Sequence, residues 1–169
     1  MQESGRDATA GGPRRLVVMR HAKAEPTAPS DHERALAARG RDDAAEAGRW
    51  LREQGVRPDA ALVSDALRTV QTWEQVLTGA DCDCVVDYSA GLYAAGADSA
   101  FDLVRETDDS VRCLVVIGHN PTMAYVAELI DDGEGDPDAT TGLVAHVVTD
   151  PEIGGCVAVG VSRSAAATA

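Results

Sequence analysis

Arginine and histidine side chains stand at the end of a short apolar run near the beginning of the chain. Residues 16–19 read Leu-Val-Val-Met, and Arg20 and His21 follow directly. A run this short and this apolar predicts a strand that is covered on both faces in a parallel sheet. Ligands of open α/β sheets bind beyond the carboxyl ends of such strands, so Arg20 and His21 stand where chemistry is usually done. From this run alone, a structural role for His21 at a strand end is an equal alternative.

Two further apolar runs bring the same residue types to the same edge of the predicted sheet. Residues 113–118 lead to His119, and residues 60–64 lead to a helix-forming segment with Arg68 in or near its first turn. Free N–H groups at a helix N-terminus and a guanidinium group both favour a bound anion. Three strand ends are therefore expected to place two arginines and two histidines around one anion-binding locus.

Four stretches of the chain carry a family resemblance. Residues 19–22 (Met-Arg-His-Ala), 64–72 (Ser-Asp-Ala-Leu-Arg-Thr-Val-Gln-Thr) and 116–121 (Val-Ile-Gly-His-Asn-Pro) resemble motifs of the histidine phosphatase (phosphoglycerate-mutase-like) superfamily. Residues 31–36 (Asp-His-Glu-Arg-Ala-Leu) resemble the Asp-x-x-Arg-x-Leu stretch of its SixA-type phosphohistidine phosphatases. A single Arg-His pair is weak evidence for the family, whereas the four stretches in this order along the chain are specific to it. The resemblance implies a single three-layer α/β/α domain over residues 15–169, with a mainly parallel central sheet.

The resemblance also implies a reaction and a role for each site residue. His21 would attack phosphorus and form a covalent phosphohistidine that water then cleaves, while Arg20 and Arg68 bind the non-bridging oxygens. Arg34 would join them by resemblance alone, since its own surroundings fit a solvated charge. His119, in its charged form, would donate to the same oxygens, and two coupled imidazoles predict a bell-shaped pH profile. No metal or other cofactor is expected, because the guanidinium groups supply the positive charge.

The expected substrate is a protein that carries phosphohistidine. No motif of the chain places a carboxylic acid where it could protonate a leaving oxygen, and a protonated phosphoramidate releases a neutral imidazole without that help. Three alternatives stay open: a general phosphatase acting on small-molecule phosphate esters, a non-catalytic phosphate-binding module, and a hydrolase using Ser64 with His119. The last lacks a recognisable nucleophile elbow around Ser64.

Composition limits the partners and the location. The chain has 15 Lys and Arg against 28 Asp and Glu, a net charge of −13, so neither nucleic acid nor an anionic membrane is an expected partner. The four cysteines lack zinc-like spacing and are expected to be reduced thiols, which indicates a cytoplasmic protein. Residues 1–14 lack an apolar segment and are expected to form a disordered leader without a secretory signal.

The remaining elements follow from periodicity and turn residues. Helices are expected at 37–54, 67–77, 99–106 and 122–130, with Asn120 as N-cap and Pro121 as first helical residue. Further strands are expected at 84–88, 143–148 and 156–161, and a loop over the crevice at 24–31. Tyr93 could line the site, although a packing role is favoured. His146 is expected to be structural, and the acidic stretch 131–138 is expected to be a solvated loop without bound metal.

Overall fold

A six-stranded sheet forms the centre of the computed structural model, which describes residues 14–108, 110–126, 143–150 and 155–162. The strands are β1 (Arg14–Arg20), β2 (Ala60–Ser64), β3 (Val85–Ser89), β4 (Cys113–Gly118), β5 (Leu143–Asp150) and β6 (Gly155–Ser162). Their order is β3-β2-β4-β1-β6-β5. The first four in this order pair in parallel, whereas β6 runs antiparallel to both β1 and β5. The prediction of a mainly parallel sheet is confirmed.

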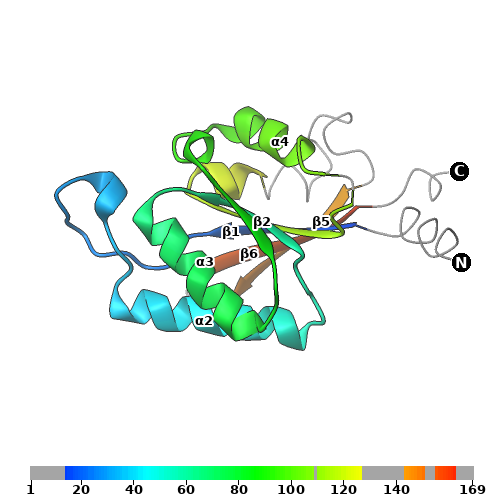
Figure 1. Ribbon diagram of the computed structural model, residues 1–169, viewed down its shortest axis with the longest axis horizontal. Helices are drawn as coiled ribbons and strands as arrows, with labels where there is room; N and C mark the ends of the chain where they lie inside the picture. The colour runs from blue at the N-terminus through cyan, green and yellow to red at the C-terminus, as the bar shows by residue number, and fades with distance from the viewer. Residues whose placement is uncertain (1–13, 109, 127–142, 151–154, 163–169) are drawn as a thin grey trace, which may run out of the picture.

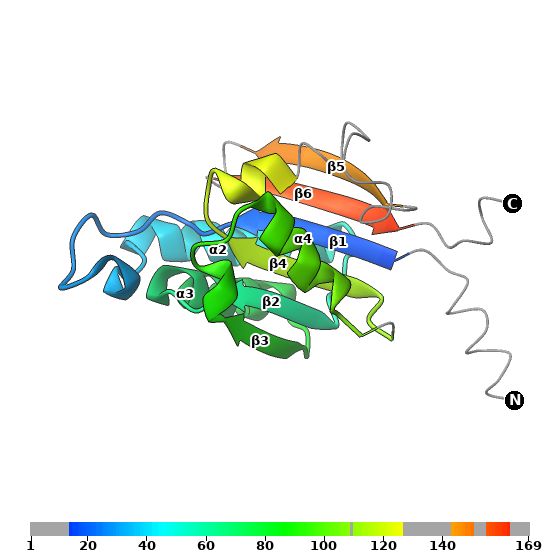
Figure 2. The same ribbon diagram turned by 90° about the horizontal axis from the view of Figure 1, so that it is seen from above.

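Helices cover both faces of the sheet, as Figures 1 and 2 show. The helices are α2 (Ala38–Glu53), α3 (Leu67–Ala80) and α4 (Ala97–Arg105), with 3-10 turns η1 (Asp31–Glu33) and η2 (Ala90–Leu92). Helices α2 and α3 lie on one face, and α4 lies on the other together with helical residues 122–126. This arrangement is the expected three-layer α/β/α domain.

The central strands are buried on both faces, which explains their continuous apolar sequence. Val17 of β1 and Val115 of β4 are fully buried in the cluster under α2 and α3. Val18 and Val116, one residue further along each strand, belong to the cluster under α4. Successive residues of one strand therefore point to opposite faces of the sheet and pack against the helices on those faces. Trp50 of α2 is partly buried and packs against the first cluster.

Two glycines let α2 and α3 approach closely. A Cβ atom on Gly48 would lie 2.2 Å from the Val76 carbonyl oxygen, and one on Gly79 would lie 2.2 Å from the Ala45 carbonyl oxygen. No side chain larger than hydrogen fits at either position without a backbone shift. A third close approach joins the start of α2 to the chain after β1, since a Cβ on Gly40 would lie 2.1 Å from the Lys23 carbonyl oxygen. These contacts hold the second half of α3 against α2 and the start of α2 against the segment that follows β1.

Some predicted boundaries shift, and others lie outside the described residues. Arg14 already belongs to β1, so the leader boundary at residue 14 is one residue too late. Helical structure begins at Thr122, and Pro121 precedes it; the Asn120 Oδ1 atom accepts a hydrogen bond from the Ala124 N–H, at 3.2 Å. The leader 1–13, the end of the predicted helix at 127–130 and the acidic stretch 131–138 lie outside the described residues, and so does the side chain of His146.

The predicted thiols can be checked at three positions. Cys82, Cys84 and Cys113 are free thiols in the structure, and burial raises the pKa of Cys113 to about 12. Within the described ranges, no group of three or more His, Cys, Asp or Glu side chains could hold a metal ion. None of the helices in the described part of the chain has both the length and the apolar character of a membrane span. The cytoplasmic location stays a prediction.

Candidate active site

The predicted histidines meet at the carboxyl edge of the parallel strands. Arg20 pairs with Gly118 in the parallel register of β1 and β4, so the next residues, His21 and His119, emerge side by side. The His21 backbone N–H donates to the Gly118 carbonyl oxygen at 3.0 Å. The two imidazole rings lie with their centroids 5.3 Å apart. Strand pairing therefore brings together two residues that are far apart in the sequence.

His21 is held as a neutral imidazole with a defined tautomer. Its Nδ1 atom lies 2.7 Å from the Ala22 carbonyl oxygen, which can only accept, so Nδ1 carries the proton. The Nε2 atom of the neutral ring then has a free lone pair. The pKa of His21 falls from 6.5 to about 4, mainly because burial desolvates the charged ring; the Ala22 hydrogen bond opposes this shift, and the positive charges of Arg68, Arg20 and Arg34 add to it.

His119 is also neutral in the free protein. Its Nδ1 atom lies 3.4 Å from the Arg68 Nη2 atom, and because a guanidinium can only donate, Nδ1 accepts. The Nε2 atom therefore carries the proton and donates to the Ser64 Oγ atom at 2.8 Å. Burial, followed by the charges of His21 and Arg68, lowers the pKa of His119 to about 4. In the free protein a second ring proton would face a guanidinium donor, so the charged form of His119 stays a prediction for the site with a phosphoryl group bound.

Arg68 is a buried cation at the first turn of α3, with only 6% of its surface exposed. Its Nη1 atom donates to the Asp31 carbonyl oxygen at 2.7 Å, and its Nη2 atom lies 3.1 Å from Asp31 Oδ2. The buried Nε atom has no hydrogen-bond partner in the described structure. A buried charge is costly unless it is paired, so Asp31 is the group that compensates Arg68.

The other two predicted arginines lie at the rim. Arg34 follows η1, donates through Nε to the Glu25 carbonyl oxygen at 2.7 Å, and places Nη1 3.1 Å from Asp31 Oδ1. Arg20 is exposed at the end of β1. Both lie close enough for their charges to lower the pKa of His21. All three predicted arginines thus contribute positive potential at the histidine pair.

Sequence reasoning missed two polar groups that complete the rim. Tyr93 was expected to pack, but its hydroxyl donates to Asp31 Oδ2 at 2.6 Å, and its ring stands edge-on to His119 with centroids 5.5 Å apart. The Nε2 atom of His32 lies 2.8 Å from Asp65 Oδ1, and the His32 ring contacts the Tyr93 ring with centroids 4.8 Å apart. The signal that could have found this rim is the Asp-x-x-Arg stretch, which contains Asp31 and His32 but suggested a role only for Arg34.

Side chains of α3 hold the loop that follows His21. The Thr72 Oγ1 atom accepts from the Ala22 N–H at 3.0 Å and donates to the Arg68 carbonyl oxygen at 2.7 Å. The Gln71 Oε1 atom accepts from the Leu36 N–H at 2.7 Å. These buried and half-buried hydrogen bonds join the segment that follows His21 to helix α3, which carries Arg68.

Ser64 serves as a support for His119. The Ser64 side chain is fully buried, so no substrate carbonyl can reach its Oγ atom. Its partner His119 presents Nε2–H to it, and the second His119 nitrogen faces Arg68 where a triad would need a carboxylate. The alternative of a Ser64-His119 hydrolase is therefore rejected.

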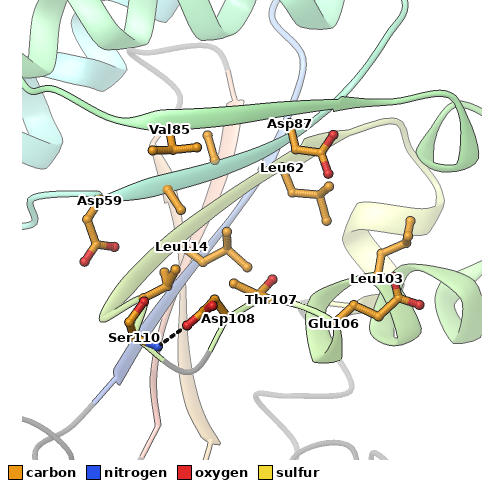
Figure 3. A pocket seen from close by; sticks show the side chains of 13 residues that line it. Asp59, Leu62, Val85, Asp87, Leu103, Glu106, Thr107, Asp108, Ser110 and Leu114 are labelled. Atoms are coloured by element: carbon orange, nitrogen blue, oxygen red, sulfur yellow. Dashed lines mark hydrogen bonds between the residues drawn. The ribbon is translucent and has the colours of Figure 1, made fainter.

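A separate pocket lies at the opposite ends of the strands, around the beginnings of β2 and β4 (Figure 3). Apolar side chains such as Leu62, Leu103 and Leu114 line it, together with carboxylates that include Asp87 and Glu106. Neither arginine nor histidine is among its described lining residues. Its charge would repel a phosphoryl group, which leaves the strand ends at His21 as the candidate active site.

The fold and this site define a class of proteins. The family model described as "Histidine phosphatase superfamily (branch 1)" matches residues 16–92. The phosphohistidine phosphatase SixA of Escherichia coli strain K12 is 33% identical over 141 residues, which cover 80% of this chain and 85% of that protein. The chain belongs to the histidine phosphatase superfamily.

Two further comparisons extend the similarity to known proteins. A solved structure of the protein histidine phosphatase SixA complexed with tungstate superposes with a TM-score of 0.67 at 28% identity, covering 88% of this chain and 96% of that one. An uncharacterized protein of Mycobacterium tuberculosis strain H37Rv is 39% identical over 129 residues, covering 76% of this chain and 79% of its own length. The family and the SixA homologues support the conclusion that this chain is a phosphatase, an enzyme of the hydrolase class.

Proposed function

We propose that the protein is a phosphohistidine phosphatase that hydrolyses protein-borne phosphohistidine through a covalent phosphohistidine on His21. One observation carries the proposal. The Ala22 carbonyl oxygen binds Nδ1–H of a neutral His21, which leaves the Nε2 lone pair free beside the guanidinium cluster of the site. A neutral imidazole next to fixed positive charge is the arrangement that nucleophilic attack on a phosphoryl dianion requires.

In the first step, His21 Nε2 attacks phosphorus and a new N–P bond forms. The bond to the substrate imidazole breaks, and that imidazole leaves neutral because its other nitrogen already carries a proton. Water then attacks the enzyme-bound phosphorus, the His21 N–P bond breaks, and inorganic phosphate and neutral His21 are regenerated. The negative charge that spreads over the equatorial oxygens in both steps is stabilised by Arg20, Arg34 and Arg68.

His119 enters the reaction as a neutral group in this proposal. Arrival of a phosphoryl dianion favours the protonated form, so His119 takes up a proton as substrate binds and then donates to a phosphoryl oxygen. The three guanidinium groups supply the charge that a divalent ion provides in other phosphoryl-transfer enzymes. The reaction is therefore proposed to need no metal.

Substrate choice is the sharpest test. The enzyme is expected to cleave phosphohistidine on a carrier protein with a much higher kcat/KM than phosphoserine peptides or sugar phosphates, with aryl phosphates between them. Each 1.36 kcal/mol of barrier that an unprotonated alkoxide leaves unrelieved is worth about tenfold in rate. An unactivated alkyl phosphate as the best substrate would contradict the proposal.

The covalent step has its own test. Rapid acid-free quenching after mixing with labelled substrate should trap an acid-labile phosphoryl group on the protein. The label should be absent from His21→Ala and should still form, more slowly, in His119→Gln, which retains the nucleophile. Label at wild-type stoichiometry in His21→Ala would assign the nucleophile to another residue.

A general phosphatase acting on small phosphate esters is the second candidate, and the superfamily includes such enzymes. The observation that favours it is the His32-Asp65 pair near His119, because an imidazole backed by a carboxylate can donate a proton to a leaving alkoxide. Good turnover of esters that His32→Gln reduces, with no effect on phosphohistidine, would favour this second function. The same variant should leave phosphohistidine hydrolysis within about twofold under the main proposal, since a pre-protonated leaving group needs no donor.

A further inference from the structure

The Asp31 carboxylate lies where the predicted phosphate-binding arginines converge. Its Oδ1 atom is 3.1 Å from Arg34 Nη1, and its Oδ2 atom is 3.1 Å from Arg68 Nη2 and 2.6 Å from the Tyr93 hydroxyl oxygen. The same Arg68 Nη2 atom lies 3.4 Å from His119 Nδ1. A carboxylate with two arginine donors and one hydroxyl donor has the contacts that two oxygens of a phosphoryl group would make in this place.

In the described part of the chain, the tip of this loop is tied to the rest of the protein by polar contacts and by the ring contact between His32 and Tyr93. The loop after β1 is closed at its base by the Ala24–Leu36 bridge and by the hydrogen bond from the Glu25 N–H to the Ala35 carbonyl oxygen, at 2.7 Å. None of the η1 residues at its tip is buried. The Asp31 side chain itself is 54% exposed. Releasing the carboxylate therefore requires no buried residue of η1 to be exposed.

The buried charge of Arg68 accounts for the position of the Asp31 carboxylate. Its side chain is 7% exposed, and Asp31 is the acidic side chain that forms an ion pair with it among the described residues. Without substrate, that buried cation needs a counter-charge. A bound phosphoryl dianion would supply one, and it would also repel Asp31, because like charges a few ångströms apart in a partly buried site are unfavourable.

We propose that Asp31 is a specificity-determining residue, a tethered anion that occupies the phosphoryl subsite of the free protein and is displaced by the phosphoryl group. This inference rests on the proposed function, since it requires that the site bind a phosphoryl group. Singly charged anions gain too little from the arginines to displace a carboxylate that is already attached to the chain. A dianion gains more, so Asp31 makes the site selective for phosphoryl groups at the cost of weaker binding.

Calorimetric titration with inorganic phosphate tests the proposal in wild type, Asp31→Asn and a control, Glu33→Gln. Glu33 lies two residues away, its carboxylate accepts a hydrogen bond from Ser30 Oγ at 2.8 Å, and its replacement removes the same unit of charge. Asp31→Asn is expected to bind phosphate about three- to tenfold more tightly, which is the range of one ion pair that no longer has to be broken. Glu33→Gln should stay within about twofold of wild type, since its charge lies outside the cluster.

Acetate gives a second readout that a merely structural role would not produce. In Asp31→Ala, free acetate should compete with phosphate by filling the vacated carboxylate position, whereas the wild type should be insensitive to it. Far-ultraviolet circular dichroism and the melting temperature of each variant confirm that the fold is retained. Weaker phosphate binding in both folded Asp31 variants, with normal binding in wild type, would overturn the inference and make Asp31 a positioning residue for the arginines. Absence of phosphate binding in every protein would instead overturn the proposed function.

Discussion

The protonation of the histidine pair can be tested without a substrate. The pKa of His21 and that of His119 both fall from 6.5 to about 4, mainly because burial disfavours the charged imidazole. At about pH 5.5, an ordinary histidine is roughly one-tenth neutral, whereas one with a pKa near 4 is almost entirely neutral. The concentration of the nucleophilic form therefore differs about tenfold between the two cases.

Histidine-detected NMR titration of the free protein measures this difference directly. The His21 and His119 signals are assigned by their loss in His21→Gln and His119→Gln. Neither should titrate between about pH 5.5 and 8, and the acid limb of kcat/KM should lie near pH 4 rather than near 6.5. The two rings interact, so the apparent pKa values belong to the pair. A His21 signal that titrates near pH 6.5 would refute the argument from burial and from the arginines.

The same shift predicts how stability depends on pH. The unfolded chain binds protons at these histidines below about pH 6.5, whereas the folded protein resists them until about pH 4. Stability should therefore fall as the pH is lowered from about 6.5 to 4, by at most about 3 kcal/mol for each histidine and less after solvent screening at these half-buried rings. Urea denaturation measured at several pH values across this range should show that the free energy of unfolding depends less steeply on pH in His21→Gln than in wild type.

Three further predictions concern the metal requirement, a buried hydrogen bond and a close helix contact. Activity should survive a chelator and be blocked by vanadate, because guanidinium groups supply the charge around His21; loss in EDTA that a divalent ion restores would contradict the metal-independent mechanism. Thr72→Val should lower the free energy of unfolding by about 1–3 kcal/mol in chemical denaturation, since it leaves the buried Ala22 N–H without its acceptor. Gly48→Ala should destabilise by about 1–3 kcal/mol or more, because its Cβ would overlap the Val76 carbonyl oxygen; a melting temperature equal to wild type would show that α2 and α3 can separate at little cost.

The amino-acid sequence by itself determines the elements that position the site. The apolar runs before His21 and His119 predict β1 and β4 because a strand buried on both faces cannot tolerate polar residues at either face. Parallel pairing then places their carboxyl ends at one edge, which is why Arg20, His21 and His119 can be grouped from their positions along the chain. The helix start at Leu67, with Arg68 in its first turn, is equally local.

Only the tertiary structure decided the charge state of the site and the partners of its arginines. The charge of His119 depends first on burial, then on His21 and on Arg68, which is 51 residues away in the sequence. The Tyr93 hydroxyl binds Asp31, 62 residues away. Such contacts leave no periodicity in the chain, because they join segments that meet only after the sheet has assembled. The desolvation that keeps both imidazoles neutral is likewise a property of the packed layers, since an isolated peptide with the same residues would leave those rings in water.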